Sequence, residues 1–237
     1  TGGGTFNNTN ALVLHDAESK LLLNSITVDS VSTSADSSSG GLDVDADSTV
    51  TSLSVANITP VAIAGGSILS GAITVSGGSL KLTETGTLAS NVSMSAETFL
   101  DVDESMTISG TLTQSGNFTT PQGWNIDVAA DKTLTYTGAA ISIGANKIIF
   151  TSGVGNVGGI FNNTNPLLLN NADSKLVFEA EVTVGSVSVN VASNASRGLR
   201  IKQSSTISSL AVAADAEFLI DSSKILSGAI SVTAGSI

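Results

Sequence analysis

A six-residue sequence occurs twice in this chain, and the distance between its two copies constrains the fold more than any other feature. Ile68–Ile73 reads Ile-Leu-Ser-Gly-Ala-Ile, and the same residues return at Ile225–Ile230, 157 positions later. The sequence Phe-Asn-Asn-Thr-Asn likewise occupies Phe6–Asn10 and Phe161–Asn165, 155 positions apart. We therefore predict an internal duplication of residues 4–80 and 159–237, with residues 81–158 forming intervening coils.

A shorter period lies inside each copy. Apolar pairs separated by one residue begin at steps of 19, 19 and 20 residues, at Leu42, Val61, Leu80 and Leu100. Another apolar residue follows each pair by eight positions, at Val50, Leu69, Leu88 and Ile108. A third alternating group follows, at Leu53/Val55, Ile73/Val75 and Val92/Met94. Because side chains of a strand alternate between two faces, this pattern predicts three short strands per unit of 19 to 20 residues.

Such a unit cannot bury its apolar face alone, but stacked units pair strand on strand at about 4.8 Å and share one core. We therefore predict an all-β fold, a single-stranded parallel β-helix of about ten coils that is continuous over residues 1–237. An antiparallel sandwich is the main alternative, but it gives no reason for a fixed repeat length. The six-residue period of left-handed solenoids is absent, which favours the right-handed form.

The expected coils start at residues 12, 42, 61, 80, 100, 126, 148, 167, 199 and 218. Two steps are long, from Leu12 to Leu42 and from Leu167 to Leu199. We therefore expect an excursion from the stack around residues 29–41, and a second one within residues 185–198. Ten coils at the strand spacing predict a rod roughly 50 Å long.

Composition excludes several classes of function. The chain has nine Lys and Arg against twenty Asp and Glu, so it lacks the many cations that neutralise phosphates, and we expect no nucleic-acid partner. No apolar run approaches the roughly 18 residues of a membrane span. The absence of cysteine removes disulfides, thiolate metal sites and cysteine nucleophiles. A cysteine-free chain rich in Ser and Thr and poor in Lys favours an extracellular or cell-surface location.

Two groups of carboxylates are candidate metal ligands. They are Asp43, Asp45 and Asp47, and Asp101, Asp103 and Glu104. Alternating carboxylates on an outward face could hold Ca²⁺, which takes six to eight oxygen ligands, but they could equally form a solvated strand face. Lys81 is expected beside Asp101 on the neighbouring coil, where it would pair part of this charge. We expect no other cofactor and no catalytic residue.

Other candidates are isolated residues or short runs. His15 is the only histidine, so multi-histidine metal sites are excluded and any Ser-His-Asp triad would depend on it. Trp124 and Tyr136 could stack on a sugar or cap the core. The threonines at 83, 85 and 87 and at 133, 135 and 137 resemble the ranks of ice-binding solenoids, but neighbouring coils are not expected to continue them.

The segments Leu80–Leu88 and Asp131–Gly138, with alternating Leu, Thr, Lys and Gly, are similar to the β-helical repeats of large bacterial surface adhesins and autotransporter passengers. This resemblance covers nearly the whole chain and implies a rigid secreted stalk or fibre. It carries no active-site residue over to this sequence.

We therefore expect a structural, surface-exposed rod without enzymatic activity, a module of an extracellular fibre, adhesin or surface layer. A polysaccharide-binding or polysaccharide-degrading β-helix is the alternative, and a degrading enzyme would need carboxylates that converge in a groove. An ice-binding solenoid is a third hypothesis.

The sequence also predicts partners. Ile237 is equivalent to Leu80, and Thr1 corresponds to Asn156, so both ends fall in mid-repeat. An open β-helix end is a template for another coil, so we expect either continuation in a longer repeat array or end-to-end self-association. Contact with a glycan or a cell surface fits the same role.

Overall fold

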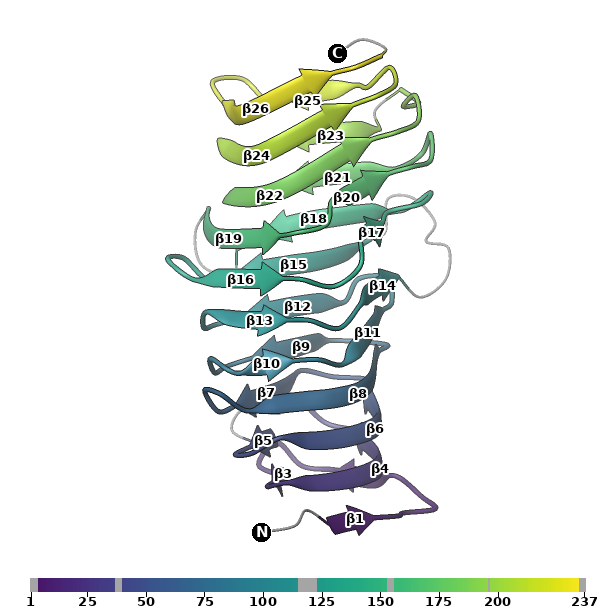
Figure 1. Cartoon of the computed structure of the whole chain (residues 1–237), viewed down its shortest axis with the longest axis vertical. Helices are drawn as coiled ribbons and strands as arrows, with labels where there is room; N and C mark the ends of the chain where they lie inside the picture. Colours follow the sequence, from purple (N-terminus) through teal and green to yellow (C-terminus); the bar gives the residue numbers. More distant parts are fainter. Residues whose placement is uncertain (1–3, 37–39, 115–122, 153–155, 196, 235–237) are drawn as a thin grey trace.

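The computed structural model describes residues 4–36, 40–114, 123–152, 156–195 and 197–234. They form a parallel β-solenoid with its N-terminus at one end of the stack and its C-terminus at the other (Figure 1). The described residues contain no helix, and therefore no helix that is long and apolar enough to cross a membrane. The predicted all-β solenoid of about ten turns is confirmed.

One wall of the solenoid is a sheet of ten strands, one from each turn. In chain order they are β3 (Lys20–Leu23), β5 (Gly41–Val44), β7 (Thr59–Ile63), β9 (Ser79–Leu82), β12 (Phe99–Val102), β15 (Trp124–Val128), β18 (Lys147–Thr151), β21 (Lys175–Phe178), β23 (Gly198–Ile201) and β25 (Phe218–Ile220). We call this wall the ten-stranded sheet.

The remaining strands form the sixteen-stranded sheet. They are β1 (Gly4–Phe6), β2 (Leu12–Leu14), β4 (Ile26–Thr33), β6 (Ser48–Val55), β8 (Ile68–Val75), β10 (Thr87–Leu88), β11 (Asn91–Met94), β13 (Met106–Ile108), β14 (Leu112–Gln114), β16 (Thr133–Tyr136), β17 (Ile141–Ser142), β19 (Val157–Asn163), β20 (Leu167–Leu169), β22 (Glu181–Val189), β24 (Ser205–Val212) and β26 (Leu226–Val232).

The chain winds as a right-handed helix. In Figure 1 the front strands run to the right, the fainter rear strands run to the left, and the chain rises from β1 to β26. The second and third strands of a turn are separate in the middle turns, as in β10 and β11, and also in the first turn, as in β1 and β2. In β4, β6, β8, β22, β24 and β26, the second and third strands run together as one strand of seven to nine residues.

Apolar side chains fill the interior along the rod. The lower turns pack Val, Leu and Ile, such as Val44, Ile63 and Leu82. The upper turns contain packed rings: Phe150 stacks on Phe178 with 5.4 Å between ring centroids, and Phe161 is tilted against Phe150 with 5.5 Å between centroids. The core is thus continuous, and no turn contains it alone.

The predicted core columns are buried, but their register is partly wrong. Val61 is the Cα partner of Leu82, whereas Leu80 lies opposite Thr59. Leu80 then pairs with Leu100, as predicted. The difference is a shift of two residues, which keeps every side chain on its own face of the strand. A similar shift places Phe150, and not Ile148, opposite Ile126.

The two predicted excursions rest on a wrong assignment of the first coil in each copy. Leu12 pairs with Val31 and Leu167 pairs with Val187, so both belong to the third strand of their turns. The true partner of Leu42 is Leu21, and that of Leu199 is Leu176. The spacings from Leu21 to Leu42 and from Leu176 to Leu199 are then 21 and 23 residues, close to the lengths of the other turns. Part of each expected excursion, residues 37–39 and 196, lies outside the described residues.

The repeated hexapeptide contains a register shift that only glycine allows. On β6, two exposed residues separate the inward-pointing Val50 and Leu53, whereas on β8 only Ala72 separates Gly71 from Ile73. The pairing therefore slips by one residue between Val50 and Ser52. Gly71 lies opposite Val50 with φ of 121°, and a Cβ on it would overlap the Val50 carbonyl oxygen. Gly228 repeats this geometry against Ile207, with φ of 125°.

Gly71→Ala should destabilise the rod by about 3 kcal/mol or more, because a positive φ and a backbone overlap both disfavour the methyl group. Gly66→Ala is the matched control: its φ of 87° is also positive, but its added Cβ meets no atom within 4 Å. That control should lose only about 1 to 2 kcal/mol. Chemical denaturation of both variants measures the difference, and equal losses would contradict the role assigned to the overlap.

Candidate functional site

The carboxylates predicted as calcium ligands lie on or beside the outer face of the ten-stranded sheet, and most of them are paired with lysines. Lys20 Nζ is 2.5 Å from Asp43 Oδ2, and Lys132 Nζ is 2.6 Å from Glu104 Oε2. Lys81 Nζ lies 3.3 Å from Asp101 Oδ2 and 2.9 Å from Asp103 Oδ2, as expected from its stacking position.

The first acidic group does not converge. Asp45 is exposed, and Asp47 Oδ1 accepts a hydrogen bond from the backbone N–H of Ile68 at 2.9 Å. Among the described residues, no three His, Asp or Glu side chains gather closely enough to hold a metal ion. Calcium binding by these six residues stays a prediction, and the observed contacts favour a charge-paired face.

The electrostatics of the Lys81 cluster follow from its partial burial. Burial lowers the pKa of Lys81, but the hydrogen bond with Asp103 and the charges of Asp101 and Asp103 outweigh it, so this pKa is raised. Burial raises the pKa of Asp101 despite the opposing charge of Lys81, and the charge of Asp103 adds to the rise.

The aromatic candidates lie inside the solenoid. Trp124 and Tyr136 are both fully buried, so they form no sugar-stacking patch and instead fill the core. Tyr136 Oη donates to the Ala139 carbonyl at 2.7 Å and accepts from the Leu112 N–H at 3.2 Å. These bonds satisfy the hydroxyl, and burial raises its pKa.

His15 lies on the exposed surface. Its Nδ1 is 2.8 Å from Ser34 Oγ on the next turn. No carboxylate forms an ion pair with its ring among the residues that the structure describes. The Ser-His contact therefore lacks the third member that orients a catalytic histidine.

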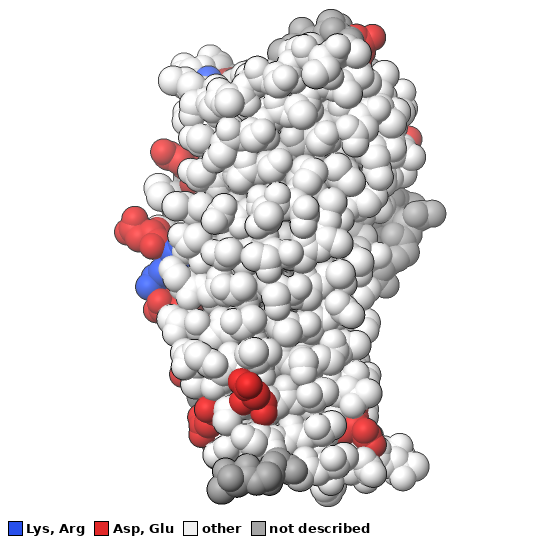
Figure 2. All heavy atoms as spheres, in the orientation of Figure 1, with Lys and Arg blue, Asp and Glu red and all other residues white. Residues whose placement is uncertain are grey.

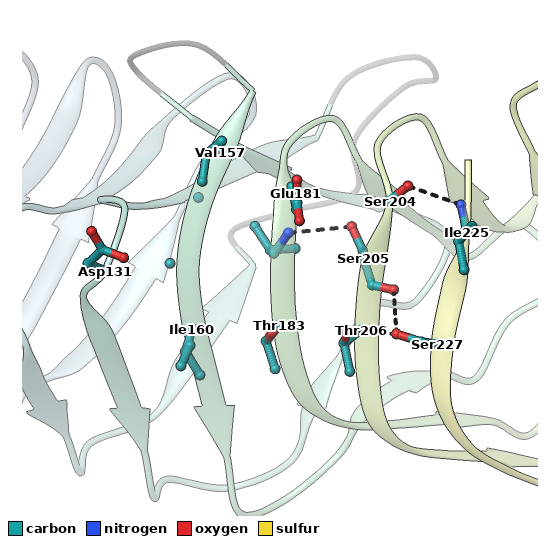
Figure 3. Close-up of a pocket in the computed structure, with 13 residues that line it drawn as sticks. Asp131, Val157, Ile160, Glu181, Thr183, Ser204, Ser205, Thr206, Ile225 and Ser227 are labelled. Atoms are coloured by element: carbon teal, nitrogen blue, oxygen red, sulfur yellow. Dashed lines mark hydrogen bonds between the residues drawn. The ribbon is translucent and has the colours of Figure 1, made fainter. Parts of the chain in front are cut away.

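A shallow groove of about 560 Å³ lies on the sixteen-stranded sheet where β19, β22, β24 and β26 run side by side (Figure 3). Hydrogen bonds join its walls across strands. Ser205 Oγ accepts from the Val182 N–H at 3.4 Å, Ser204 Oγ accepts from the Ile225 N–H at 3.2 Å, and the Thr206 and Ser227 hydroxyls are 2.8 Å apart.

The first copy contains an equivalent groove of about 460 Å³ across β1, β4, β6 and β8. Its contacts match one for one: Ser48 Oγ accepts from the Ile26 N–H at 3.3 Å, Asp47 accepts from Ile68, and the Thr49 and Ser70 hydroxyls are 2.8 Å apart. Both grooves therefore occur where the repeated hexapeptide shifts the register, and their hydroxyls bond neighbouring turns.

The second repeated motif also joins turns. Asn8 Nδ2 donates to the Ser30 carbonyl at 2.7 Å, and Asn163 Nδ2 donates to the equivalent Ser186 carbonyl at 2.7 Å. The Oδ1 atom of each asparagine accepts the backbone N–H of the same serine, at 3.2 and 3.0 Å. Each asparagine thus replaces backbone pairing between turns, which is a structural role for the repeat.

The outer face of the sixteen-stranded sheet carries hydroxyl residues in columns. Thr87, Thr107 and Thr135 are successive cross-strand partners, and so are Thr5, Thr27, Thr49 and Ser70. The expectation that neighbouring coils do not continue the threonine ranks is therefore wrong for Thr87 and Thr135. Thr83 and Thr85 lie outside the strands. Most charged side chains visible in Figure 2 lie at the edges of this face or near the N-terminal end.

A group of cations on or next to β18, β21 and β23 was not expected from the sequence. Its members are Lys147, Lys175, Arg197, Arg200 and Lys202. The distribution of basic residues in the sequence could have indicated this group, because six of the nine lie between positions 147 and 224.

Lys81→Met should raise the pKa of Asp101 further, because the cation that lowers it is removed while burial and Asp103 remain. Since the folded state then holds the proton more tightly, the free energy of unfolding should fall more steeply as pH rises through this pKa. Carboxyl NMR titration measures the shift. Lys132→Met, which removes the partner of Glu104, is the control; a shift of Asp101 as large in that variant would contradict the assignment.

No protein-family model matches the chain, and neither a curated protein nor a solved structure is detectably similar to it.

Proposed function

We propose that the chain is a structural rod exposed at a cell surface, a module of an extracellular fibre, adhesin or surface layer, without enzymatic activity. The observation that carries this proposal is the continuous apolar core, which runs from β3 to β24 with each turn bonded to the next. A rod of this kind resists bending because every turn is held by backbone hydrogen bonds along the axis.

The distribution of polar groups supports the same proposal. Hydrolysis of a glycosidic bond requires two carboxyl groups on either side of one groove. Here four of the six predicted carboxylates lie on the other wall and bond to lysines. Asp131 and Glu181 line the larger groove and Asp47 lines the smaller one, where Asp47 bonds to a backbone N–H. Hydroxyls that bond one another across strands line much of the rest of both grooves.

The terminal turns support extension of the rod. At one end the inward-pointing Leu12 and Leu14 are only partly buried, and at the other end Ile230 and Val232 are nearly half exposed. Ile73 and Val75, the internal counterparts of Ile230 and Val232, are buried because β11 covers them. A further turn would cover the exposed residues, so we propose that the stack extends, through continuing chain or a second copy.

The rod should release no reducing ends from a panel of acidic and neutral polysaccharides, and electron microscopy should show it as straight particles that lengthen at high concentration. Turnover of any glycan would overturn the structural role. Particles that stay single at all concentrations would instead reject self-stacking and leave only extension by continuing chain.

Ice binding is a second candidate, and the hydroxyl columns favour it. Thr107 and its neighbours repeat at the strand spacing of about 4.8 Å on a face with few charges, and regular hydroxyls can order water. The expected result is thermal hysteresis that Thr107→Lys abolishes and Thr85→Lys, in a turn, preserves. A freezing point equal to the melting point in the unmodified chain would reject this candidate.

A further inference from the structure

The larger groove owes its shape to a bulge in β19. Between Val157 and Ile160 the pairing with β22 shifts, so Gly158 and Gly159 lie opposite a single residue of β22. Neither glycine carries a side chain, so the wall is hollow at this point, and both glycines line the groove of about 560 Å³ (Figure 3). A Cβ on Gly159 would overlap the Lys132 carbonyl oxygen of the preceding turn, so this part of the floor requires glycine.

A carboxylate lies on each side of this glycine floor. Asp131 precedes β16 on one neighbouring turn, and Glu181 begins β22 on the other (Figure 3). Asp131 has a φ of 62°, in the left-handed region that Asp adopts more readily than most residues. Two turns at about 4.8 Å per turn place the backbones of Asp131 and Glu181 about 10 Å apart.

The charges of these two carboxylates are not paired. Among the residues that the structure describes, neither Asp131 nor Glu181 takes part in an ion pair. Lys132, which follows Asp131 in the sequence, bonds to Glu104. The described lining of the groove contains no Lys, Arg or His. The groove is therefore a hollow with two negative charges and no cation of its own.

Aliphatic side chains line the same groove. Val157 is 53% exposed, Ile160 is 42% exposed and Ile225 is 65% exposed. Single exposed aliphatic residues are common on proteins, but here three of them lie in one hollow beside two carboxylates. The groove thus combines apolar surface with separated negative charges.

The groove of the first copy lacks this combination. Thr5 and Ser25 there occupy the positions of Ile160 and Glu181. Asp47, the acidic residue in the described lining of that groove, already accepts a hydrogen bond from the backbone N–H of Ile68. The hydroxyl pairs and the glycine register shift are common to both grooves, so these differences distinguish the second copy.

We propose that the larger groove binds a linear aliphatic diamine or polyamine. One ammonium group bonds to Asp131 and another to Glu181, and the methylene chain between them covers Val157 and Ile160. Charge-assisted hydrogen bonds hold the two ends, and burial of apolar surface holds the middle. The charge complementarity between groove and ligand selects this class of compound. Binding here goes beyond the structural role proposed above and does not depend on it.

A divalent cation fits the groove less well. Ca²⁺ takes about six to eight oxygen ligands within about 2.6 Å, whereas these two carboxylates come from turns about 10 Å apart. No three His, Asp or Glu side chains converge anywhere in the described part of the chain.

A glycan also fits the groove less well. A neutral sugar leaves both carboxylates without a counter-charge, and the described lining offers no aromatic ring on which a sugar could stack. In a glycosidase, apolar surroundings keep one of the two carboxyl groups protonated so that it can act as general acid. Asp131 and Glu181 are both exposed, so the groove is suited to binding a cation and not to hydrolysis.

The test is isothermal titration calorimetry with ethylenediamine, putrescine, spermidine, butylamine and Ca²⁺ as separate probes. Physiological salt screens the general attraction of cations to a chain with a net charge of −11. The site variant is Asp131→Asn/Glu181→Gln, because asparagine also tolerates the positive φ at position 131. The control, Asp45→Asn/Asp47→Asn, changes the net charge equally, and an amide oxygen at position 47 can still accept the Ile68 N–H.

Putrescine and spermidine should bind more tightly than ethylenediamine, which is too short to reach both carboxylates, and than butylamine, which has one charge. The site variant should weaken spermidine binding about tenfold or more, because both charge-assisted contacts are lost. The control variant should change the affinity less than about twofold, since its carboxylates lie outside the larger groove.

Equal losses in the site and control variants would overturn the proposal, because they would mean attraction to the net charge alone. Butylamine binding as tightly as spermidine, Ca²⁺ binding more tightly than any amine, or no saturable binding of any amine would overturn it as well. Thermal unfolding without ligand checks that both variants fold. If the double site variant is less stable than the wild type, Glu181→Gln alone replaces it and should still weaken spermidine binding relative to Asp47→Asn.

Discussion

Backbone hydrogen bonding between successive turns determines where every other group in this molecule lies. A turn of the solenoid contains too little apolar surface to fold alone, so its neighbours complete its core. The apolar columns, the hydroxyl columns and the lysine–carboxylate pairs all follow this register. The register between neighbouring turns can shift by two residues, so that Val61 pairs with Leu82 and not with Leu80, because such a shift keeps the inward and outward faces of each strand unchanged. A slip of one residue requires a glycine, and both copies place one there, at Gly71 and Gly228.

The alternating apolar pattern was sufficient to predict the solenoid, because inward residues recur at nearly constant intervals. It could not separate Leu12 from Leu21 as the start of a turn, since both belong to apolar pairs of the same form. Only the partner strand distinguishes them: Leu21 meets Leu42, whereas Leu12 meets Val31. Charge pairing of Lys81 with Asp101 was predicted from spacing, but the group of cations near β18, β21 and β23 was not. Its members come from turns of unequal length, so no fixed interval connects Lys147, Lys175 and Arg200.

The two sequences that recur without change are explained by architecture. Asn8 and Asn163 replace backbone bonds between turns, and the hexapeptides combine a glycine register shift with a hydroxyl pair. A position whose role more than one side chain can fill differs between the copies: Asp47 in the first is Ser204 in the second, and each accepts a hydrogen bond from the backbone N–H of the equivalent isoleucine. A duplication can therefore preserve the rod while its outer walls acquire different charges.

The distribution of charged residues along the chain makes the rod electrically asymmetric. Residues 1–118 carry twelve Asp and Glu with two Lys, whereas residues 119–237 carry eight Asp and Glu with seven Lys and Arg. Because the turns are stacked in chain order, almost all of the net negative charge lies in one half of the long axis. Two such rods side by side repel least when they point in opposite directions, and a negatively charged surface orients a single rod with its less negative half toward the surface. The molecule therefore has a polarity that its repetitive backbone does not display.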